Sequence, residues 1–273
     1  MELFPDGHHV RLRSRVHGTY LYADENAVGV SLRPRRAARA SLNAAWAVHL
    51  VVRGGDTFVL LHSAATGRYL ALSANPAPSG HRGRLAFLTY YDHPGQDDVV
   101  WMAVRAGHGA GDDEVLLQHV SSGLLRANGR YLFWHTRVTV DDYANRSTMM
   151  HWMVEAIPPR PAPPLLPHPS AGPVERRCIQ FVRAHEHGEF HESGWKFFWF
   201  DGRSVSQLRV DVAQRVGEEN VEDITLCVRA GLHGRLTPLV IDLPWGEAPM
   251  DVVVLTTGSP AAEGLRYPDV DAP

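Results

Sequence analysis

The sequence has 273 residues, a hydrophobic content of 44% and a formal net charge of −3 at pH 7 with its 16 histidines counted as neutral. This length allows two domains, and the near-neutral charge gives no general attraction to nucleic acid or to an anionic membrane. We expect no membrane-spanning helix, no signal peptide and, with two cysteines, no disulfide framework. The expected location is therefore the reducing cytoplasm.

A twelve-residue motif occurs three times in the first half of the chain. Residues 10–21 and 59–70 both read Val-x-Leu-x-Ser-x-x-x-Gly-x-Tyr-Leu. Residues 115–126 keep the pattern with His119 for the serine, Leu125 for the tyrosine and Arg126 for the last leucine. Alternation of apolar and polar residues predicts a strand with one buried face. The glycine predicts a tight turn with positive φ, so each copy predicts a β-hairpin.

A tryptophan follows each copy of the motif, at Trp46, Trp101 and Trp152, and is predicted to lie in the core. Three repeats of about four short strands predict a closed, pseudo-threefold all-β domain, because closure removes the exposed edges of a sheet. A β-trefoil over residues 1–156 fits best. A propeller is the alternative, but three blades are too few for a stable ring.

Four arginines, Arg33, Arg35, Arg36 and Arg39, lie between the first motif and its tryptophan. Guanidinium groups pair with carboxylates or phosphates in a fork geometry, so this basic patch is a candidate partner-binding surface. The alternative is a hairpin tip whose arginines contact only solvent.

Residues 157–173 form a proline-rich linker. This composition favours an extended polyproline II backbone and disfavours helix and sheet, which is typical of a semi-rigid spacer. A proline-rich docking ligand for another protein is the alternative.

Residues 174–273 form a second, α+β domain. Strands are predicted at 177–182, 195–200, 224–228, 236–241 and 250–255, with one helix at 205–216 between the second and third strands. Ser204 and Gln207 have the spacing of a reciprocal capping box, and Gly217 predicts the end of the helix. The order ββαβββ indicates a β-grasp, ubiquitin-like fold.

Residues that could carry chemistry are few. His185, His187 and His191 could hold zinc, but the zinc-protease pattern is incomplete and a polar hairpin loop is the simpler interpretation. Cys178 and Cys227 lie in predicted apolar strands, where a free cysteine is commonly inert. Phosphate-binding glycine loops and nucleophile elbows are absent from the sequence. We therefore expect a non-enzymatic protein without a cofactor.

The motif at 10–21 and 59–70 resembles the repeats of fascin-like, actin-cross-linking β-trefoils. The whole chain is similar to a plant family known as domain of unknown function 569. The segments that carry this resemblance are residues 1–7, 10–14, 40–46, 69–73, 124–131 and 256–260. The resemblance implies a fascin-like trefoil in the first domain, for a family without a settled activity.

Taken together, the residues and the resemblance predict a binding or scaffold protein. Actin filaments are the first expected partner, because they are acidic and the arginine patch is basic. A carbohydrate- or small-ligand-binding trefoil is an alternative, although the Gln-x-Trp pattern of ricin-type lectins is missing. A protein adaptor acting through the β-grasp domain is a further alternative.

Overall fold

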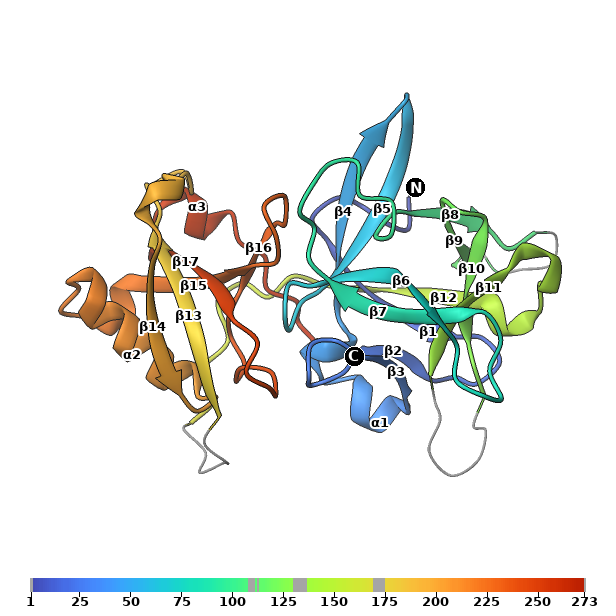
Figure 1. Cartoon of the computed structure of the whole chain (residues 1–273), viewed down its shortest axis with the longest axis horizontal. Helices are drawn as coiled ribbons and strands as arrows, with labels where there is room; N and C mark the ends of the chain where they lie inside the picture. Colours follow the sequence, from blue (N-terminus) through green and yellow to red (C-terminus); the bar gives the residue numbers. More distant parts are fainter. Residues whose placement is uncertain (1, 108–110, 112, 130–136, 169–174, 273) are drawn as a thin grey trace. The chain divides into compact units, whose positions relative to one another are not determined.

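The computed structural model describes residues 2–107, 111, 113–129, 137–168 and 175–272 (Figure 1). Contacts divide the chain into two compact units. The first comprises Met1–Ala64, Arg68–Pro159 and Pro268–Pro273, and the second comprises Ala65–Gly67 and Arg160–Tyr267. The first unit therefore includes the C-terminal residues, and the described part of the proline-rich linker belongs mainly to the second. The linker prolines Pro169 and Pro173, and Arg130 and Tyr131 of the family motif, lie outside the described residues.

The first unit is a β-trefoil, as the repeats predicted. Among its described residues the strands are β1 (His9–Ser14), β2 (Tyr20–Ala23), β3 (Val30–Arg33), β4 (Trp46–Arg53), β5 (Asp56–Ser63), β6 (Tyr69–Pro76), β7 (Arg84–Thr89), β8 (Trp101–Arg105), β9 (Glu114–His119), β10 (Gly123–Ala127), β11 (Val138–Asp142) and β12 (His151–Ile157). Short helical turns are α1 (Arg35–Ala38), Leu42–Ala44, Tyr143–Asn145 and Thr148–Met150.

Six of these strands close a barrel. β4 pairs with β5, β8 with β9, and β12 with β1, and each of β1, β5 and β9 also pairs with the tryptophan strand of its own repeat. The β12–β1 pairing runs from His9 opposite Ile157 to Ser14 opposite Trp152, so the third repeat joins the first. The remaining strands form the hairpins β2–β3, β6–β7 and β10–β11.

The three repeat tryptophans occupy equivalent positions in the core. Trp46, Trp101 and Trp152 are fully buried. Each indole N–H donates to the backbone carbonyl oxygen of a leucine in the hairpin of its own repeat. The acceptors are Leu21 for Trp46 at 3.2 Å, Leu70 for Trp101 at 2.9 Å and Leu125 for Trp152 at 3.0 Å. A buried indole N–H needs an acceptor, so this contact fixes each tryptophan against its own hairpin.

The turn of the third repeat differs from the prediction. Gly18 and Gly67 have φ of +64° and +72°, as the motif indicated, but in the third copy Ser122 has the positive φ of +72° and Gly123 begins β10. A Cβ on Gly123 would lie 2.6 Å from the side chain of Val140. Gly123 is therefore needed for close packing against β11 and not for turn geometry.

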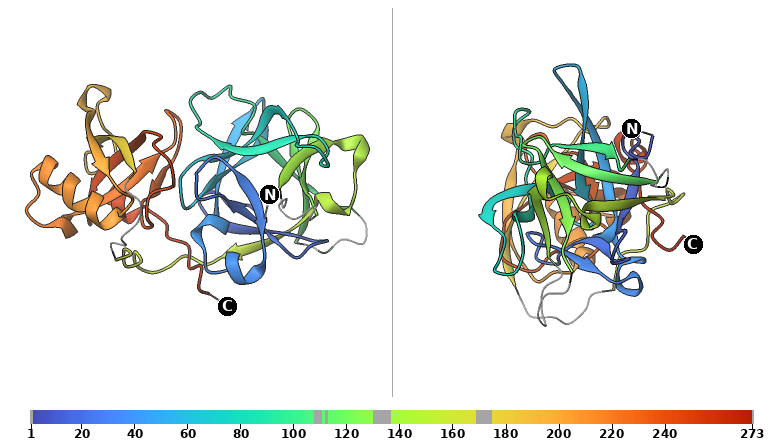
Figure 2. Two further views of the ribbon diagram at one scale, coloured as in Figure 1. Left: turned by 60° about the horizontal axis from the view of Figure 1, so that its bottom comes forward. Right: turned by 90° about the vertical axis from the view of Figure 1, so that its right-hand side faces the viewer.

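The second unit has the predicted ubiquitin-like order. Its strands are β13 (Arg176–Arg183), β14 (Lys196–Asp201), β15 (Ile224–Arg229), β16 (Leu236–Pro238) and β17 (Met250–Thr256), and its helices are α2 (Val205–Val216), α3 (Pro260–Glu263) and the turns Glu192–Gly194 and Val221–Asp223. The sheet order is β14-β13-β17-β15-β16, with β13 and β17 parallel at its centre. Helix α2 lies across one face of this sheet (Figure 1, Figure 2).

Helix α2 begins and ends largely as predicted. Ser204 accepts a hydrogen bond from the Gln207 backbone N–H at 3.2 Å, and Gly217 ends the helix with φ of +79°. The capping box is only half formed, because the Gln207 amide donates forward to Asp211 at 2.9 Å and does not reach back. An i,i+4 side-chain pair on the helix surface competes directly with the reciprocal cap.

Candidate functional site

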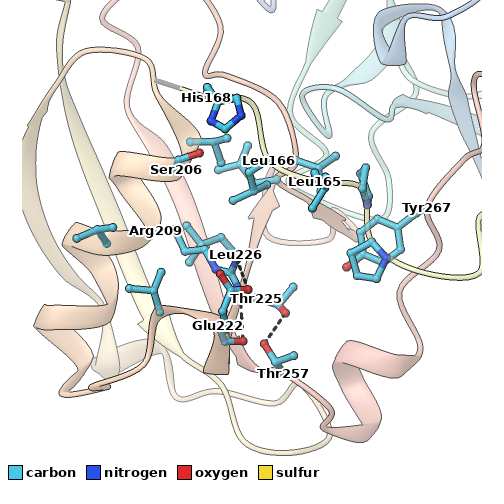
Figure 3. A pocket seen from close by; sticks show the side chains of 17 residues that line it. Leu165, Leu166, His168, Ser206, Arg209, Glu222, Thr225, Leu226, Thr257 and Tyr267 are labelled. Carbon is cyan, nitrogen blue, oxygen red and sulfur yellow. Dashed lines mark hydrogen bonds and ion pairs between the residues drawn. The ribbon is translucent and has the colours of Figure 1, made fainter. Parts of the chain in front are cut away.

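A cavity of about 690 Å³ lies in the second unit (Figure 3). One wall is the proline-rich segment 163–168, and a second is the first half of α2. The others are β15, the residues after β16, and the segment that follows α3. Most of the side chains that line it are apolar: Pro163, Pro164, Leu165, Leu166, Val205, Val210, Val221, Leu226, Leu239 and Val240.

The proline-rich wall is held in place by a hydrogen bond and by apolar packing. The Ser206 hydroxyl on α2 donates to the carbonyl oxygen of Pro167 at 2.6 Å, and Leu166 packs against the core beneath α2. The preceding residue, Leu165, also lines the cavity, but its side chain is 98% exposed. The linker is thus one wall of a hollow, with an apolar side chain at its rim.

Helical periodicity explains which α2 residues reach the cavity. Val205, Leu208 and Val212 recur at the spacing of a buried stripe and pack on the sheet. Arg209 follows Leu208 by about 100° around the helix axis and lies beside this stripe, whereas Val210, about 200° from Leu208, lies farther round the helix. Both line the cavity.

Arg209 is the cationic group of the cavity. Its Nε donates to the carbonyl oxygen of Ile224 at 2.9 Å, and its Nη1 lies 3.2 Å from Oε2 of Glu222. The Arg209 side chain is 16% exposed, whereas that of Glu222 is 78% exposed. The backbone contact therefore fixes the guanidinium, and the carboxylate is a solvent-screened partner.

Tyr267 supplies a hydroxyl to the opposite part of the lining (Figure 3). The side chain is 8% exposed, and burial raises the pKa of its phenol to about 12, although the positive charge of Arg209 acts in the opposite direction. Among the described residues this hydroxyl has no hydrogen-bond partner, while the other two hydroxyls near it, Thr225 and Thr257, bond each other at 3.0 Å. Tyr267 therefore remains protonated and can donate.

The predicted arginine patch lies on the trefoil, in and around α1. Arg33, Arg35 and Arg36 are exposed, and Arg33 stacks over the ring of Tyr22 at 5.4 Å. Arg39 is half-buried, and its Nη2 lies 3.5 Å from the carbonyl oxygen of Ala272 in the C-terminal segment. Three of the four arginines thus share an exposed surface, and the fourth is engaged within its own unit.

Arg33 also borders a polar hollow of about 450 Å³ on the trefoil, together with Asp24, Asn26, Ser31 and Arg137. Several of its polar atoms have partners within the unit. The Ser31 hydroxyl donates to Asp24 at 2.5 Å, and the Asn26 side-chain oxygen accepts from the backbone N–H of Gly29 at 2.9 Å.

The histidine cluster lies in the loop between β13 and β14. His185, His187 and His191 are all exposed, and the rings of His185 and His191 meet edge to face with centroids 5.9 Å apart. In the described part of the chain, no three His, Cys, Asp or Glu side chains are arranged to hold a metal ion. Nor is any helix in that part long and apolar enough to span a membrane.

The two thiols lie on strands that do not pair. Cys178 is on β13 and Cys227 is on β15, and β17 runs between these strands. Burial raises the pKa of the Cys227 thiol to about 12, so this sulfur stays protonated and unreactive near neutral pH.

Sequence reasoning missed the cavity. The available signal was the apolar pair Leu165-Leu166 inside an otherwise proline-rich segment. A pure spacer has no need of large apolar side chains, so such a pair indicates contact with an apolar surface.

Solved structures similar to this chain include the SDF2-like protein from Arabidopsis thaliana, with 17% identity over 55% of this chain and 92% of that chain and a TM-score of 0.44. The designed threefold-symmetric protein ThreeFoil shows 18% identity over 54% of this chain and 97% of that chain, with a TM-score of 0.40. A lectin from Polyporus squamosus shows 16% identity over 56% of this chain and 50% of that chain, with a TM-score of 0.42. A comparison with curated proteins gives no match.

Two family models match the chain. The model of the DUF569-associated ubiquitin-like domain matches residues 175–255, which contain β13 to β15, β16 and nearly all of β17. The model of the beta-trefoil domain of unknown function DUF569 matches residues 1–155, which contain the three repeats. The chain therefore belongs to the DUF569 family of β-trefoil proteins with an associated ubiquitin-like domain.

Proposed function

We propose that this chain is a non-catalytic binding protein whose ubiquitin-like unit holds a small, largely apolar ligand in the cavity beside the proline-rich segment. The observation that carries the proposal is the cavity itself. Its volume of about 690 Å³ falls within the range typical of ligand sites, and leucine, valine and proline side chains dominate its lining. A few polar groups, Arg209 and Tyr267 among them, are available to orient a ligand.

The chemistry of the lining supports binding without catalysis. A covalent mechanism needs a nucleophile within hydrogen-bond reach of a base. His168 also lines the cavity, but the Ser206 hydroxyl donates to the Pro167 carbonyl and not to a base, and the carboxylate of Glu222 is exposed and paired with Arg209. Cys227 is fully buried as a thiol and does not line the cavity.

The test uses N-phenyl-1-naphthylamine, a neutral fluorophore whose emission rises in apolar surroundings. The full-length protein is expected to bind it saturably. Val210→Trp places an indole into the cavity from α2 and is expected to abolish binding, because the added ring fills the space that the probe would occupy.

The matched control is Val52→Trp, which adds the same ring at a valine of β4 that is 71% exposed. This variant is expected to bind the probe as the unmodified protein does. Absence of saturable binding to the unmodified protein, or equal binding by the Val210→Trp variant, would contradict the proposal.

A second candidate function is docking of an acidic protein partner on the trefoil, with actin filaments as the expected example. Its support is that Arg33, Arg35 and Arg36 are exposed on neighbouring positions of β3 and α1. Arginine forks recognise surface carboxylates, and the attraction survives physiological salt only when several charges act together.

Cosedimentation with filamentous actin at physiological salt tests this candidate. The double variant Arg35→Glu/Arg36→Glu is expected to lose most of the bound fraction. Arg82→Glu/Arg84→Glu makes the same charge change at two other exposed trefoil arginines and is expected to bind normally. If both double variants lost the same bound fraction, the binding would be non-specific electrostatic attraction. If the unmodified protein did not cosediment with actin, the proposed docking to actin filaments would be rejected.

A further inference from the structure

The polar groups of the cavity differ in how far their hydrogen bonding is already satisfied. Ser206 is used to hold the linker at Pro167, and Thr225 and Thr257 bond each other. Tyr267 is the exception: its hydroxyl lines the cavity, its side chain is more than nine-tenths buried, and it has no hydrogen-bond partner among the described residues. The Tyr267 hydroxyl is therefore a donor that no described protein group uses, on a mostly buried side chain, and a ligand atom in the cavity can accept from it.

Arg209 sets the sign of the charge that the site favours. Its guanidinium lines the same cavity as Tyr267, and its positive charge opposes the rise in that phenol's pKa. Its bonds to the backbone carbonyls of Ile224 and Glu222 hold it at the cavity wall. The Glu222 carboxylate also lines the cavity and pairs with Arg209, but its side chain is 78% exposed, so solvent screens that pairing. A fixed cation in a partly dehydrated site favours an anionic ligand group.

We infer that the ligand of this cavity is an amphipathic carboxylate, whose apolar body lies against the leucines of the proline-rich segment and whose carboxylate accepts from the Tyr267 hydroxyl and is attracted to Arg209. The inference rests on the ligand-binding function proposed above and adds the chemical class of the ligand. Because burial raises the pKa of Tyr267 to about 12, the phenol donates throughout the pH range in which a carboxylate is ionised.

The alternatives within the same cavity are a neutral apolar molecule and an uncharged molecule with one oxygen. A neutral hydrocarbon would leave the Tyr267 hydroxyl unpaired. An ester or ketone would satisfy that hydroxyl but would be attracted to Arg209 less strongly than a carboxylate. Hydrogen bonds to a charged acceptor are about twice as strong as neutral ones, so the two cases are separable by affinity.

The experiment measures displacement of N-phenyl-1-naphthylamine from the full-length protein by decanoic acid and by methyl decanoate at pH 7.5. We expect decanoate to bind at least about tenfold more tightly than the ester. In Tyr267→Phe and in Arg209→Gln, this preference, measured as the ratio of the two affinities within the same variant, is expected to shrink to about threefold or less.

Tyr143→Phe is the matched control. It removes the same hydroxyl from a half-exposed tyrosine of the trefoil, where the oxygen accepts from Arg146, and it is expected to leave both affinities unchanged. A melting curve of each variant verifies that the second unit remains folded.

The outcomes separate the two proposals. If the neutral probe does not bind at all, the ligand-binding function fails. If the probe binds and Val210→Trp blocks it, but acid and ester bind equally or Tyr267→Phe leaves the preference intact, the cavity is a ligand site and the carboxylate class is wrong.

Discussion

His119 stands where the first two repeats have the fully buried serines Ser14 and Ser63. The larger ring is accommodated because its two nitrogens have partners: Nδ1 lies 2.8 Å from the Ser121 hydroxyl, and Nε2 lies 3.2 Å from the carbonyl oxygen of Asp98. With Nε2 protonated, the neutral ring donates to the carbonyl and accepts from the serine. The imidazole therefore acts as a cross-link between β9 and the loop before β8.

This histidine makes the stability of the trefoil dependent on pH. Burial lowers the pKa of His119, although the bond to the Asp98 carbonyl acts in the opposite direction. A pKa lower in the folded than in the unfolded state means that the unfolded state binds the proton first as pH falls below the ordinary value of 6.5. The contribution of neutral His119 to the unfolding free energy is complete above pH 6.5. It is lost as the pH falls towards the pKa of His119 in the folded state.

We therefore predict that the melting temperature of the trefoil falls between pH 7 and pH 5 and that His119→Gln makes this fall smaller. Glutamine keeps a donor and an acceptor but does not titrate, and all other histidines remain as a common background. Calorimetry of both proteins at the two pH values measures the difference. Parallel pH dependence in the two proteins would mean that His119 does not titrate in this range.

The type of residue predicted the buried tryptophans correctly and the turn of the third repeat incorrectly. A tryptophan repeated three times predicted the core because burying an indole is favourable in any well-packed site. The turn at Ser122 was missed because the same glycine can serve a positive φ or a close approach, and the motif alone does not distinguish these uses.

At the scale of elements, the order of the ubiquitin-like unit was predicted because each signal is local. The cap at Ser204, the buried stripe of α2 and the stop at Gly217 act within one helix. Strand β16 ends at Pro238, earlier than its apolar run, although the Leu239 N–H still donates to the Leu226 carbonyl of β15 at 2.9 Å.

The candidate site was not predictable in the same way, because it depends on where an extended segment lies. Proline content describes the backbone conformation of 157–173 but not the surface that it contacts. The bond from Ser206 to Pro167 and the packing of Leu166 join residues that lie far apart in the sequence. Neither side of this contact has a periodic pattern that would indicate the other.

At the scale of the whole molecule, the trefoil unit is discontinuous in sequence, because its last part is the C-terminal segment 268–272. Val270 is 8% exposed and packs with Ala45, Ala64 and Ile157 of the trefoil. The buried guanidinium of Arg11 donates to the carbonyl oxygens of Val270 at 2.7 Å and Arg39 at 2.5 Å, and the Asp269 N–H donates to Pro158 at 2.8 Å. The segment thus completes the surroundings of a buried charge as well as an apolar cluster.

If this segment belongs energetically to the trefoil, shortening the buried side chain of Val270 must destabilise the trefoil, although the rest of that unit ends some hundred residues earlier in the sequence. We predict that Val270→Ala lowers the unfolding free energy of the trefoil by about 1–2 kcal/mol, because it removes two buried methyl groups. A domain of this size then melts a few degrees lower.

Val52→Ala deletes the same atoms where valine is 71% exposed and is expected to change the unfolding free energy by less than about 0.5 kcal/mol. Calorimetry that resolves the unfolding transition of the trefoil measures both variants. An unchanged melting temperature in Val270→Ala would show that the segment contacts the trefoil without stabilising it.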